Sequence, residues 1–234
     1  MGLQLNDPAV KYKAFYGRIS EQMPMLLAEG RIPLSVTGIM NRKREVASSP
    51  YKELKEVWLE NYFHAGDALV THPNGRTKID LDSIYGRGLN PRSNIVNGSL
   101  VLSPAEYKKI HGSEFSLRDR EKYTGREQTK RQAKQNPFWQ GLMRGDKNAL
   151  NEVVDVIFAV AEETYGYDKN MGIYLPSPQE TPTLRLWCLF RLYLRSGARG
   201  DYELVYDDGQ LLAVAPEAQV GSPDKKDLER RVQA

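Results

Sequence analysis

The sequence predicts an α+β protein with a helical N-terminal portion, a small antiparallel sheet built from two hairpins, and helices packed on one face of that sheet. Two observations support this fold class. Apolar residues recur at helical spacing through the first sixty residues, and further along the chain short β-prone runs flank Asn-Gly and Asp-Gly turns. With 40% hydrophobic and 27% charged residues, the 234-residue chain has the composition of a protein that folds.

Three helices are expected before residue 66. The first begins at Asp7-Pro8, because Asp caps helices and Pro is favoured at the first helical position, and it ends at Gly30. The second segment, residues 35–46, begins with Ser35 as its cap, and the third, residues 49–62, begins with Ser49 as its cap. The N-terminal portion is therefore expected to be helical.

Turn signals predict the two hairpins. Residues 68–71 and 77–81 flank an Asn-Gly turn, and residues 202–206 and 210–215 flank an Asp-Gly turn. The segment 183–196 fits neither the helical nor the strand period, so its assignment stays open between a buried helix and a strand.

Two further helices have clear boundary signals. Ser103 and Glu106 form a capping box, because each side chain can satisfy a free backbone N–H at the start of a helix. Asp146 caps a long helix whose apolar residues recur at i, i+3, i+4 and i+7, and Gly166 ends it.

The pattern of elements suggests three parts of the chain. Residues 1–66 are expected to form a helical N-terminal subdomain and residues 67–219 an α+β main domain. Residues 220–234, which are rich in Gly, Ser, Pro and charged residues, are expected to form a mobile tail.

A cytoplasmic protein without membrane association is expected. Cys188 is the single cysteine of the chain, which fits a reducing compartment. No N-terminal apolar segment resembles a signal peptide, and the longest apolar stretch, residues 184–194, is too short to span a bilayer. The formal net charge of +3 permits an anionic partner without requiring one.

Residues 117–135 lead to the main functional hypothesis. This segment holds seven basic and three acidic residues, and the aromatic residue Trp139 follows it. Cationic side chains neutralise phosphates and aromatic rings stack on bases, so the segment favours non-catalytic binding of DNA or RNA. An ordinary solvated helix has the same pattern. The basic residues are Arg118, Arg120, Lys122, Arg126, Lys130, Arg131 and Lys134.

Helical geometry and two other basic groups extend this hypothesis. If residues 117–135 formed one helix, Arg126, Lys130 and Lys134 would share a face that can follow phosphates. A helix-turn-helix arrangement over residues 19–44 would set a second helix beside a duplex. The additional candidate contacts are Asn41, Arg42, Lys43 and Arg44 on that helix, and Arg87 and Arg92 on a later loop.

Two alternatives remain open. One is a protein-interaction or scaffold module whose basic faces meet an acidic protein. The other is a metal-dependent nuclease in which Asp80 and Asp82, followed by Glu106 and Lys108, hold Mg²⁺ and activate water.

Enzymatic activity is not favoured, because the three histidines lack zinc-site spacing and no phosphate-binding loop or nucleophile elbow occurs. The lead hypothesis accordingly predicts no cofactor and no resident metal. The oligomeric state stays open.

Overall fold

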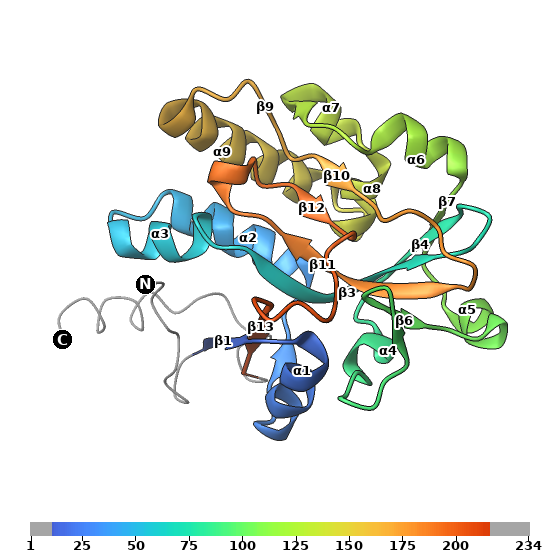
Figure 1. Cartoon of the computed structure of the whole chain (residues 1–234). Coiled ribbons are helices and arrows are strands. Elements are labelled where there is room, and N and C mark those ends of the chain that lie inside the picture. The colour runs from blue at the N-terminus through green and yellow to red at the C-terminus, as the bar shows by residue number, and fades with distance from the viewer. Residues whose placement is uncertain (1–10, 216–234) are drawn as a thin grey trace.

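A sheet of eleven strands runs through the centre of the described chain, residues 11–215 of a computed structural model (Figure 1). Its strands are β1 (Tyr12–Tyr16), β2 (Ile32–Pro33), β3 (Phe63–Thr71), β4 (Thr77–Asp80), β5 (Ile95–Val96), β6 (Ser99–Val101), β7 (Ser113–Phe115), β10 (Ile173–Tyr174), β11 (Thr183–Leu189), β12 (Ala198–Arg199) and β13 (Gln210–Val214). The main path of the sheet is β1-β13-β3-β11-β12-β10, and the other strands attach beside it. A separate pair is formed by β8 (Gln128–Thr129) and β9 (Lys169–Asn170).

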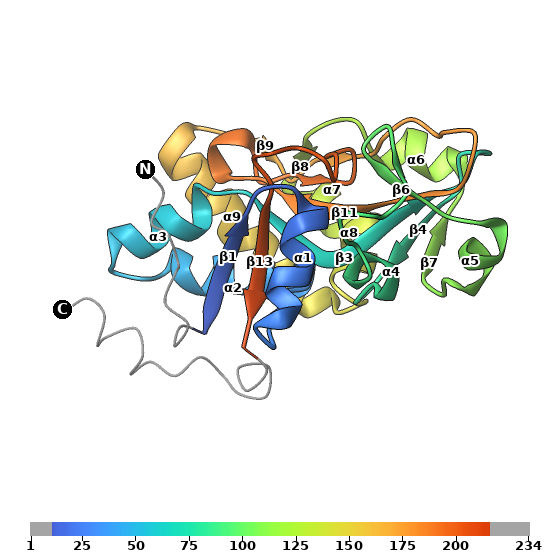
Figure 2. The ribbon, with the colours of Figure 1, turned by 60° about the horizontal axis from the view of Figure 1, so that its bottom comes forward.

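Helices cover both faces of this sheet. They are α1 (Ile19–Ala28), α2 (Val36–Ala47), α3 (Lys52–Leu59), α4 (Ile84–Arg87), α5 (Pro104–Lys109), α6 (Leu117–Tyr123), α7 (Lys130–Gln135), α8 (Pro137–Leu142), α9 (Lys147–Tyr165) and the short 3-10 helix η1 (Leu192–Leu194). The helices α2, α3, α8 and α9 pack on one face, whereas α1 and α4 pack on the other (Figure 1 and Figure 2). Within residues 11–215, every helix is too short or too polar to cross a membrane.

Strand β13 shows how the sheet is packed. Leu211 and Ala213 join the hydrophobic cluster that includes α1, whereas Leu212 and Val214 join the larger cluster that includes α2, and all four residues are at most 1% exposed. Alternate residues of a strand point to opposite faces, so a strand covered on both sides is apolar at every position.

The same packing settles the segment 183–196, which contains β11 rather than a long helix. Leu184 and Leu186 join the cluster of α1, and Trp187 and Leu189 join that of α2. Every residue of β11 is buried, including Thr183 and Arg185, so its sequence shows no clear two-residue alternation of apolar and polar residues.

One of the two predicted hairpins is confirmed and the other is wrong. Strands β3 and β4 form the first hairpin, with Thr71 opposite Thr77. Residues 202–206 form no strand, and β13 pairs with β1 and β2 and contacts β3 instead. The sheet is therefore much larger than the predicted sheet of two hairpins, and helices cover both of its faces rather than one.

The predicted first helix is wrong at residues 12–16, which form β1. Ala14 and Phe15 pack into opposite clusters, so pairing with β13 buries both faces of this strand. Gly17, with a φ of +124°, makes the turn into α1, and few residues other than glycine adopt this conformation. The predicted cap Asp7-Pro8 lies outside the described residues.

The other helix predictions are largely confirmed, and the chain is α+β. The hydroxyl of Ser35 caps α2, and Ser103 and Glu106 form the capping box of α5. The predicted third helix is shorter than expected: α3 covers Lys52–Leu59, its N-cap residue is Tyr51, and Ser49 does not cap it. Asp146 caps α9, and Gly166 ends that helix in the left-handed conformation.

The division of the chain into parts stays a prediction. The boundary proposed after residue 66 falls within β3. The predicted tail, residues 220–234, lies outside the described residues.

A buried carboxylate, that of Asp67 on β3, joins three parts of the fold. It accepts hydrogen bonds from the backbone N–H of Val36, at 2.7 Å, and of Asp82, at 2.8 Å, and lies 3.7 Å from the guanidinium of Arg144. Burial raises the pKa of Asp67, and these donors partly offset that rise. The side chain thereby fixes the start of α2 and the turn after β4.

We expect Asp67→Ala to lower the free energy of unfolding by roughly 2–4 kcal/mol, because the buried N–H of Val36 and the part-buried N–H of Asp82 lose their acceptor. The matched control is Asp155→Ala. This carboxylate is half-exposed, so its removal should cost less than about 1 kcal/mol. Urea unfolding of both variants measures the difference, and equal losses would contradict the structural role of Asp67.

Candidate functional site

The basic segment predicted to form one helix forms two short ones. α6 ends at Tyr123, and a turn with Gly125 and the strand β8 precede α7. Arg126, Lys130 and Lys134 therefore do not share a helical face.

Several side chains of this segment are already engaged within the protein. Lys130 and Lys134 both form salt bridges with Asp155 of α9, at 2.7 and 2.8 Å, and these two lysines lower the pKa of Asp155. Arg120 is 8% exposed and donates to the carbonyl oxygen of Pro176 at 2.6 Å. Arg118, Lys122, Arg126 and Arg131 remain exposed.

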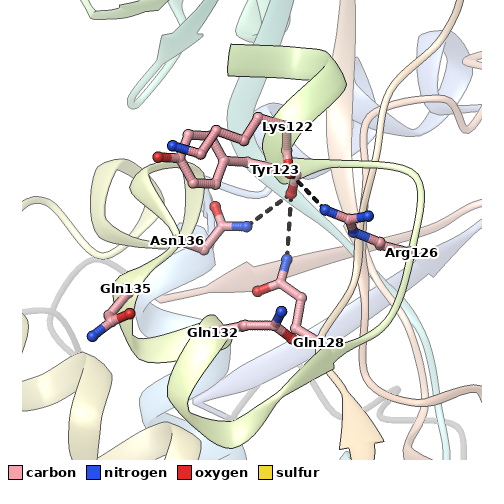
Figure 3. Close-up of a pocket in the computed structure, with 7 residues that line it drawn as sticks. All are labelled: Lys122, Tyr123, Arg126, Gln128, Gln132, Gln135 and Asn136. Carbon is pink, nitrogen blue, oxygen red and sulfur yellow. Dashed lines mark hydrogen bonds between the residues drawn. The ribbon is translucent and has the colours of Figure 1, made fainter. Parts of the chain in front are cut away.

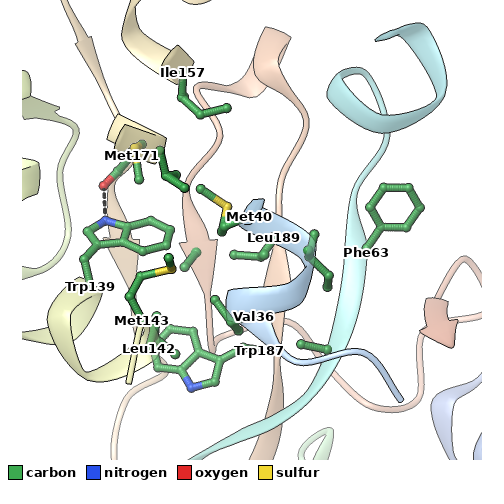
Figure 4. Close-up of a cluster of buried hydrophobic side chains, with 14 of the residues drawn as sticks. Val36, Met40, Phe63, Trp139, Leu142, Met143, Ile157, Met171, Trp187 and Leu189 are labelled. Atoms are coloured by element: carbon green, nitrogen blue, oxygen red, sulfur yellow. Dashed lines mark hydrogen bonds between the residues drawn. The ribbon is translucent and has the colours of Figure 1, made fainter. Parts of the chain in front are cut away.

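Trp139, the predicted base-stacking residue, belongs to the core. It is fully buried and donates its indole N–H to the carbonyl oxygen of Met171 at 2.7 Å (Figure 4). In the same cluster Trp187 lies beside Val36 of α2 and Leu142 of α8 (Figure 4). Trp139 thus docks α8 onto the sheet and is not available to a ligand.

The predicted recognition helix, α2, is also packed within the protein. The guanidinium of Arg42 lies over the rings of Tyr12 and Trp58, at 5.4 and 5.6 Å. Lys43 is fully buried, and burial lowers its pKa to about 8. Arg44 pairs with Glu152 of α9.

Asn41 is only partly exposed, and its side-chain oxygen is buried without a hydrogen-bond partner among the described residues. Together with its neighbours on α2, it lies in a helix that packs against α3 and α9. This helix cannot enter a groove of DNA.

Arg87 and Arg92 lie elsewhere. Arg87 ends α4, on the opposite face of the sheet from α8 and α9, and donates to the carbonyl oxygen of Asp82 at 2.6 Å. Arg92 is exposed on the loop that follows. The structure does not gather the predicted basic residues into one surface.

The acidic residues of the nuclease alternative have other partners. Asp82 forms a salt bridge with Arg144 at 2.8 Å, and Glu106 accepts the backbone N–H of Ser103 at 2.7 Å in the capping box. Asp80 is nearly buried, which raises its pKa, and Lys108 lies on α5. In the part of the chain that the structure describes, no three His, Cys, Asp or Glu side chains are grouped to hold a metal ion.

A different surface stands out in the structure, the segment of residues 190–199, which consists of the turn after β11 and the short strand β12 and is called here the loop of residues 190–199. Leu192 is 1% exposed and anchors the loop in the core, whereas Tyr193 and Leu194 are 55% and 43% exposed. Beneath the loop, the buried Nζ of Lys43 donates to the carbonyl oxygen of Phe190 at 2.9 Å. The loop therefore holds two large apolar side chains in solvent on a fixed support.

The backbone of this loop is constrained by hydrogen bonds. The N–H of Arg195 donates to the carbonyl oxygen of Leu192 at 2.7 Å, and the N–H of Met171 donates to that of Arg195 at 2.8 Å. Arg195 and Ser196 have φ values of +62° and +43°, which residues other than glycine rarely adopt. Strained backbone that tertiary contacts maintain is common at functional sites.

Aromatic rings support the exposed end of the loop. The ring of Tyr193 meets that of Tyr165 edge-on at 5.8 Å, and Tyr165 stacks on Tyr167 at 5.4 Å. The hydroxyl of Tyr167 donates to the carbonyl oxygen of Tyr193, and the guanidinium of Arg195 lies 4.1 Å from the Tyr167 ring centre. These contacts limit the conformational freedom of the exposed side chains.

A cavity of about 300 Å³ borders the loop. Arg199 at this cavity pairs with Asp201 at 2.7 Å, whereas Arg195 has no carboxylate partner among residues 11–215. Burial and the neighbouring carboxylate of Glu127 raise the pKa of Tyr174 to about 12, so its hydroxyl stays protonated. The cavity is lined by Glu127, Tyr174, Phe190, Tyr193, Leu194, Arg195, Gly197 and Arg199.

More aromatic residues continue the surface beyond Phe190. The ring of Tyr202 contacts those of Phe190, at 5.9 Å, and Tyr206, at 5.1 Å. His64 lies against Tyr202 at 5.0 Å, accepts the N–H of Gln210 on its Nδ1, and has no partner for its buried Nε2 within the described chain. Burial lowers the pKa of His64 to about 4.

The sequence contained a signal for this loop. In Arg-Leu-Tyr-Leu-Arg-Ser-Gly, residues 191–197, Ser-Gly marks a turn directly after the apolar run. Because the run 183–196 fitted neither period, the end of the strand was not visible. The exposure of Tyr193 and Leu194 is a property of the folded chain alone.

Comparison with known proteins identifies the fold. The chain is similar to the solved structure described as "Accommodation of massive sequence variation in Nanoarchaeota by the C-type lectin fold", with a TM-score of 0.66 and 16% sequence identity, over 89% of this chain and 100% of the other. No protein-family model matches the sequence. No curated protein matches it either.

The prediction of nucleic-acid binding is wrong. The C-type lectin fold of the similar structure gives it no support. Several predicted contacts, among them Arg42, Arg120 and Trp139, are buried inside the protein. The remaining basic residues are dispersed over both faces of the sheet.

Lowering the pH should destabilise the wild-type protein more than a His64→Asn variant. In the unfolded chain the imidazole of His64 binds a proton near pH 6.5, whereas in the folded chain its pKa is about 4. The stability that depends on neutral His64 is therefore complete above pH 6.5 and is lost as the pH falls towards 4. The expected loss by pH 4.5 is roughly 2–3 kcal/mol. Asn keeps an acceptor for Gln210 and does not titrate.

Urea unfolding at pH 7 and pH 4.5 measures this difference between the two proteins. Equal losses of stability would show that His64 is not held neutral by burial.

Proposed function

We propose that the protein is a protein-interaction module and that the loop of residues 190–199 is the centre of its interface. One observation carries this proposal: Tyr193 and Leu194 are exposed side by side on a constrained turn, between Arg191 and Arg195. Tyrosine and arginine are enriched at protein interfaces, where they are prominent among the residues that dominate binding energy. The similarity to a C-type lectin fold supports a binding module.

The rigid support of the loop favours tight binding. Association costs free energy when side chains and loops become ordered. Here Leu192 anchors the turn and Tyr165 fixes the ring of Tyr193, so less order remains to be gained on binding.

The charges around the loop indicate the chemistry of the partner. Within residues 11–215, Arg191 and Arg195 form no salt bridge, and Arg191 is exposed. A complementary surface would place carboxylates opposite these two cations and an apolar depression opposite Tyr193 and Leu194. The partner that fits is a protein with an acidic, partly apolar surface.

Tyr206 and Val205 can extend the same interface. They are 44% and 38% exposed, and Tyr206 connects through Tyr202 to Phe190 at the base of the loop. Such an interface would have an apolar centre with a polar rim, as stable protein complexes do.

Replacing Tyr193 and Leu194 by Ala should weaken partner binding at least about tenfold, since truncating a central aromatic residue typically costs about 2 kcal/mol or more. The partner is first captured with the full chain from cells of the source organism and then titrated as a purified protein by calorimetry. The matched control, Met25→Ala with Leu27→Ala, removes two exposed apolar side chains from α1. A partner that binds both double variants equally would refute the proposed interface.

Charge reversal tests the acidic nature of the partner. Arg191→Glu with Arg195→Glu should slow association and reverse its dependence on salt, because attraction between opposite charges becomes repulsion. Stopped-flow association rates at two salt concentrations measure this effect. Arg118→Glu with Arg131→Glu, a reversal at exposed positions on α6 and α7, is the control. Faster association after reversal at residues 191 and 195 would contradict an acidic partner.

A further inference from the structure

A polar hollow lies where α6, β8 and α7 meet, and it shares no lining residue with the cavity at the loop of residues 190–199 (Figure 3). Its volume is about 230 Å³, below the range of roughly 300–1,000 Å³ for sites that take drug-sized ligands. A hollow of this size suits a single small ring. It is lined by Lys122, Tyr123, Arg126, Gln128, Gln132, Gln135 and Asn136.

One side chain in this hollow lacks a partner. Gln128 is 5% exposed, and its Oε1 accepts no hydrogen bond within the described chain. Its Nε2 makes one long hydrogen bond, of 3.4 Å, to the carbonyl oxygen of Tyr123. Buried acceptors almost always have a donor, so this oxygen points to a missing one.

Asn136, which donates to the same carbonyl oxygen of Tyr123, shows the contrast (Figure 3). Its Oδ1 accepts the N–H groups of Phe138 and Trp139, and its Nδ2 donates to Tyr123 at 2.9 Å. This amide is fully used by the fold. The Gln128 amide, held by one long hydrogen bond, can turn toward a ligand at little cost.

The rim of the hollow supplies positive charge and further donors. Lys122 and Arg126 are exposed, and neither forms a salt bridge among residues 11–215. The guanidinium of Arg126 donates to the carbonyl oxygen of Lys122 at 3.0 Å, which leaves its other N–H groups available. The Oε1 of Gln132 is engaged by Thr129, so its amide N–H₂ is the group it can offer to a ligand.

We propose that this hollow binds an anionic sugar, a hydroxylated ring that carries a carboxylate or a phosphate. A hydroxyl group would supply the donor that Gln128 lacks, and the anionic group would lie against Lys122 and Arg126. Inorganic phosphate carries an O–H group but no ring to fill the hollow, and a neutral sugar leaves the two cations unpaired. The ring of Tyr123 also lines the hollow, with the Nζ of Lys122 lying 4.7 Å from its centre.

Titrations of the full chain, followed by NMR, test this inference with four probes: glucuronate, glucose 6-phosphate, glucose and inorganic phosphate. One or both anionic sugars should bind at least about tenfold more tightly than glucose and than phosphate. Which of the two binds distinguishes a carboxylated from a phosphorylated ligand. Phosphate binding as tight as that of the sugars would indicate an adventitious ion only, and absence of binding by both anionic sugars would overturn the inference.

Variants assign the binding to this hollow. Lys122→Gln with Arg126→Gln should reduce the affinity for the anionic sugar to that for glucose, whereas Arg118→Gln with Arg131→Gln, exposed cations that do not line the hollow, should leave it unchanged. Gln128→Leu should lower the affinity for the anionic sugar at least about tenfold.

If the Leu variant does not fold, Gln128→Glu takes its place, because the glutamate side chain keeps an acceptor but repels the anion. This variant should lower the affinity for the anionic sugar more than the affinity for glucose. Unchanged affinity in the folded Gln128 variants would overturn the inference.

Discussion

Burial of the central strands on both faces is the constraint on which the structure depends. In β3, β11 and β13 successive side chains enter opposite hydrophobic clusters, so helices must cover the sheet from both sides. Pairing of β1 with β13 brings the first and last described strands together at the same sheet. The apolar area removed from water across these strands is the main stabilising contribution available to the fold.

The same constraint shapes the proposed interface. β11 leaves the core after Leu189, and Leu192 returns to it three residues later, so the backbone between them must turn sharply. Tyr193 and Leu194 then have no place in either cluster and face solvent. The buried Lys43 supports this turn by donating a hydrogen bond to the carbonyl oxygen of Phe190. Its charge suggested a nucleic-acid contact, but in the folded protein its role is structural.

Buried polar groups complete the arrangement by satisfying the backbone of connecting segments. Asp67 holds the start of α2, and Arg185 donates to the carbonyl oxygen of Asn97 and the hydroxyl of Ser99, so it ties the loop before β6 to β11. Gln128 at the hollow between α6 and α7 is one of several buried polar side chains that lack a partner among the described residues, and it is the one that lines this hollow. Fold similarity at 16% identity leaves the ligands to be argued from such local chemistry.

The sequence by itself determined the local features. The capping box at Ser103, the boundaries of α9 at Asp146 and Gly166, and the Asn-Gly turn of the first hairpin depend on neighbouring residues, so their signals lie within a few positions of the chain. Tertiary structure alone decided that residues 12–16 form a strand, that Trp139 and Arg120 are buried, and that the turn after β11 presents Tyr193 to solvent. Strand pairing and burial bring together residues up to about two hundred positions apart, which neighbouring residues in the sequence cannot indicate. An amphipathic or basic pattern also has the same sequence whether it faces solvent, another element of the fold or a ligand.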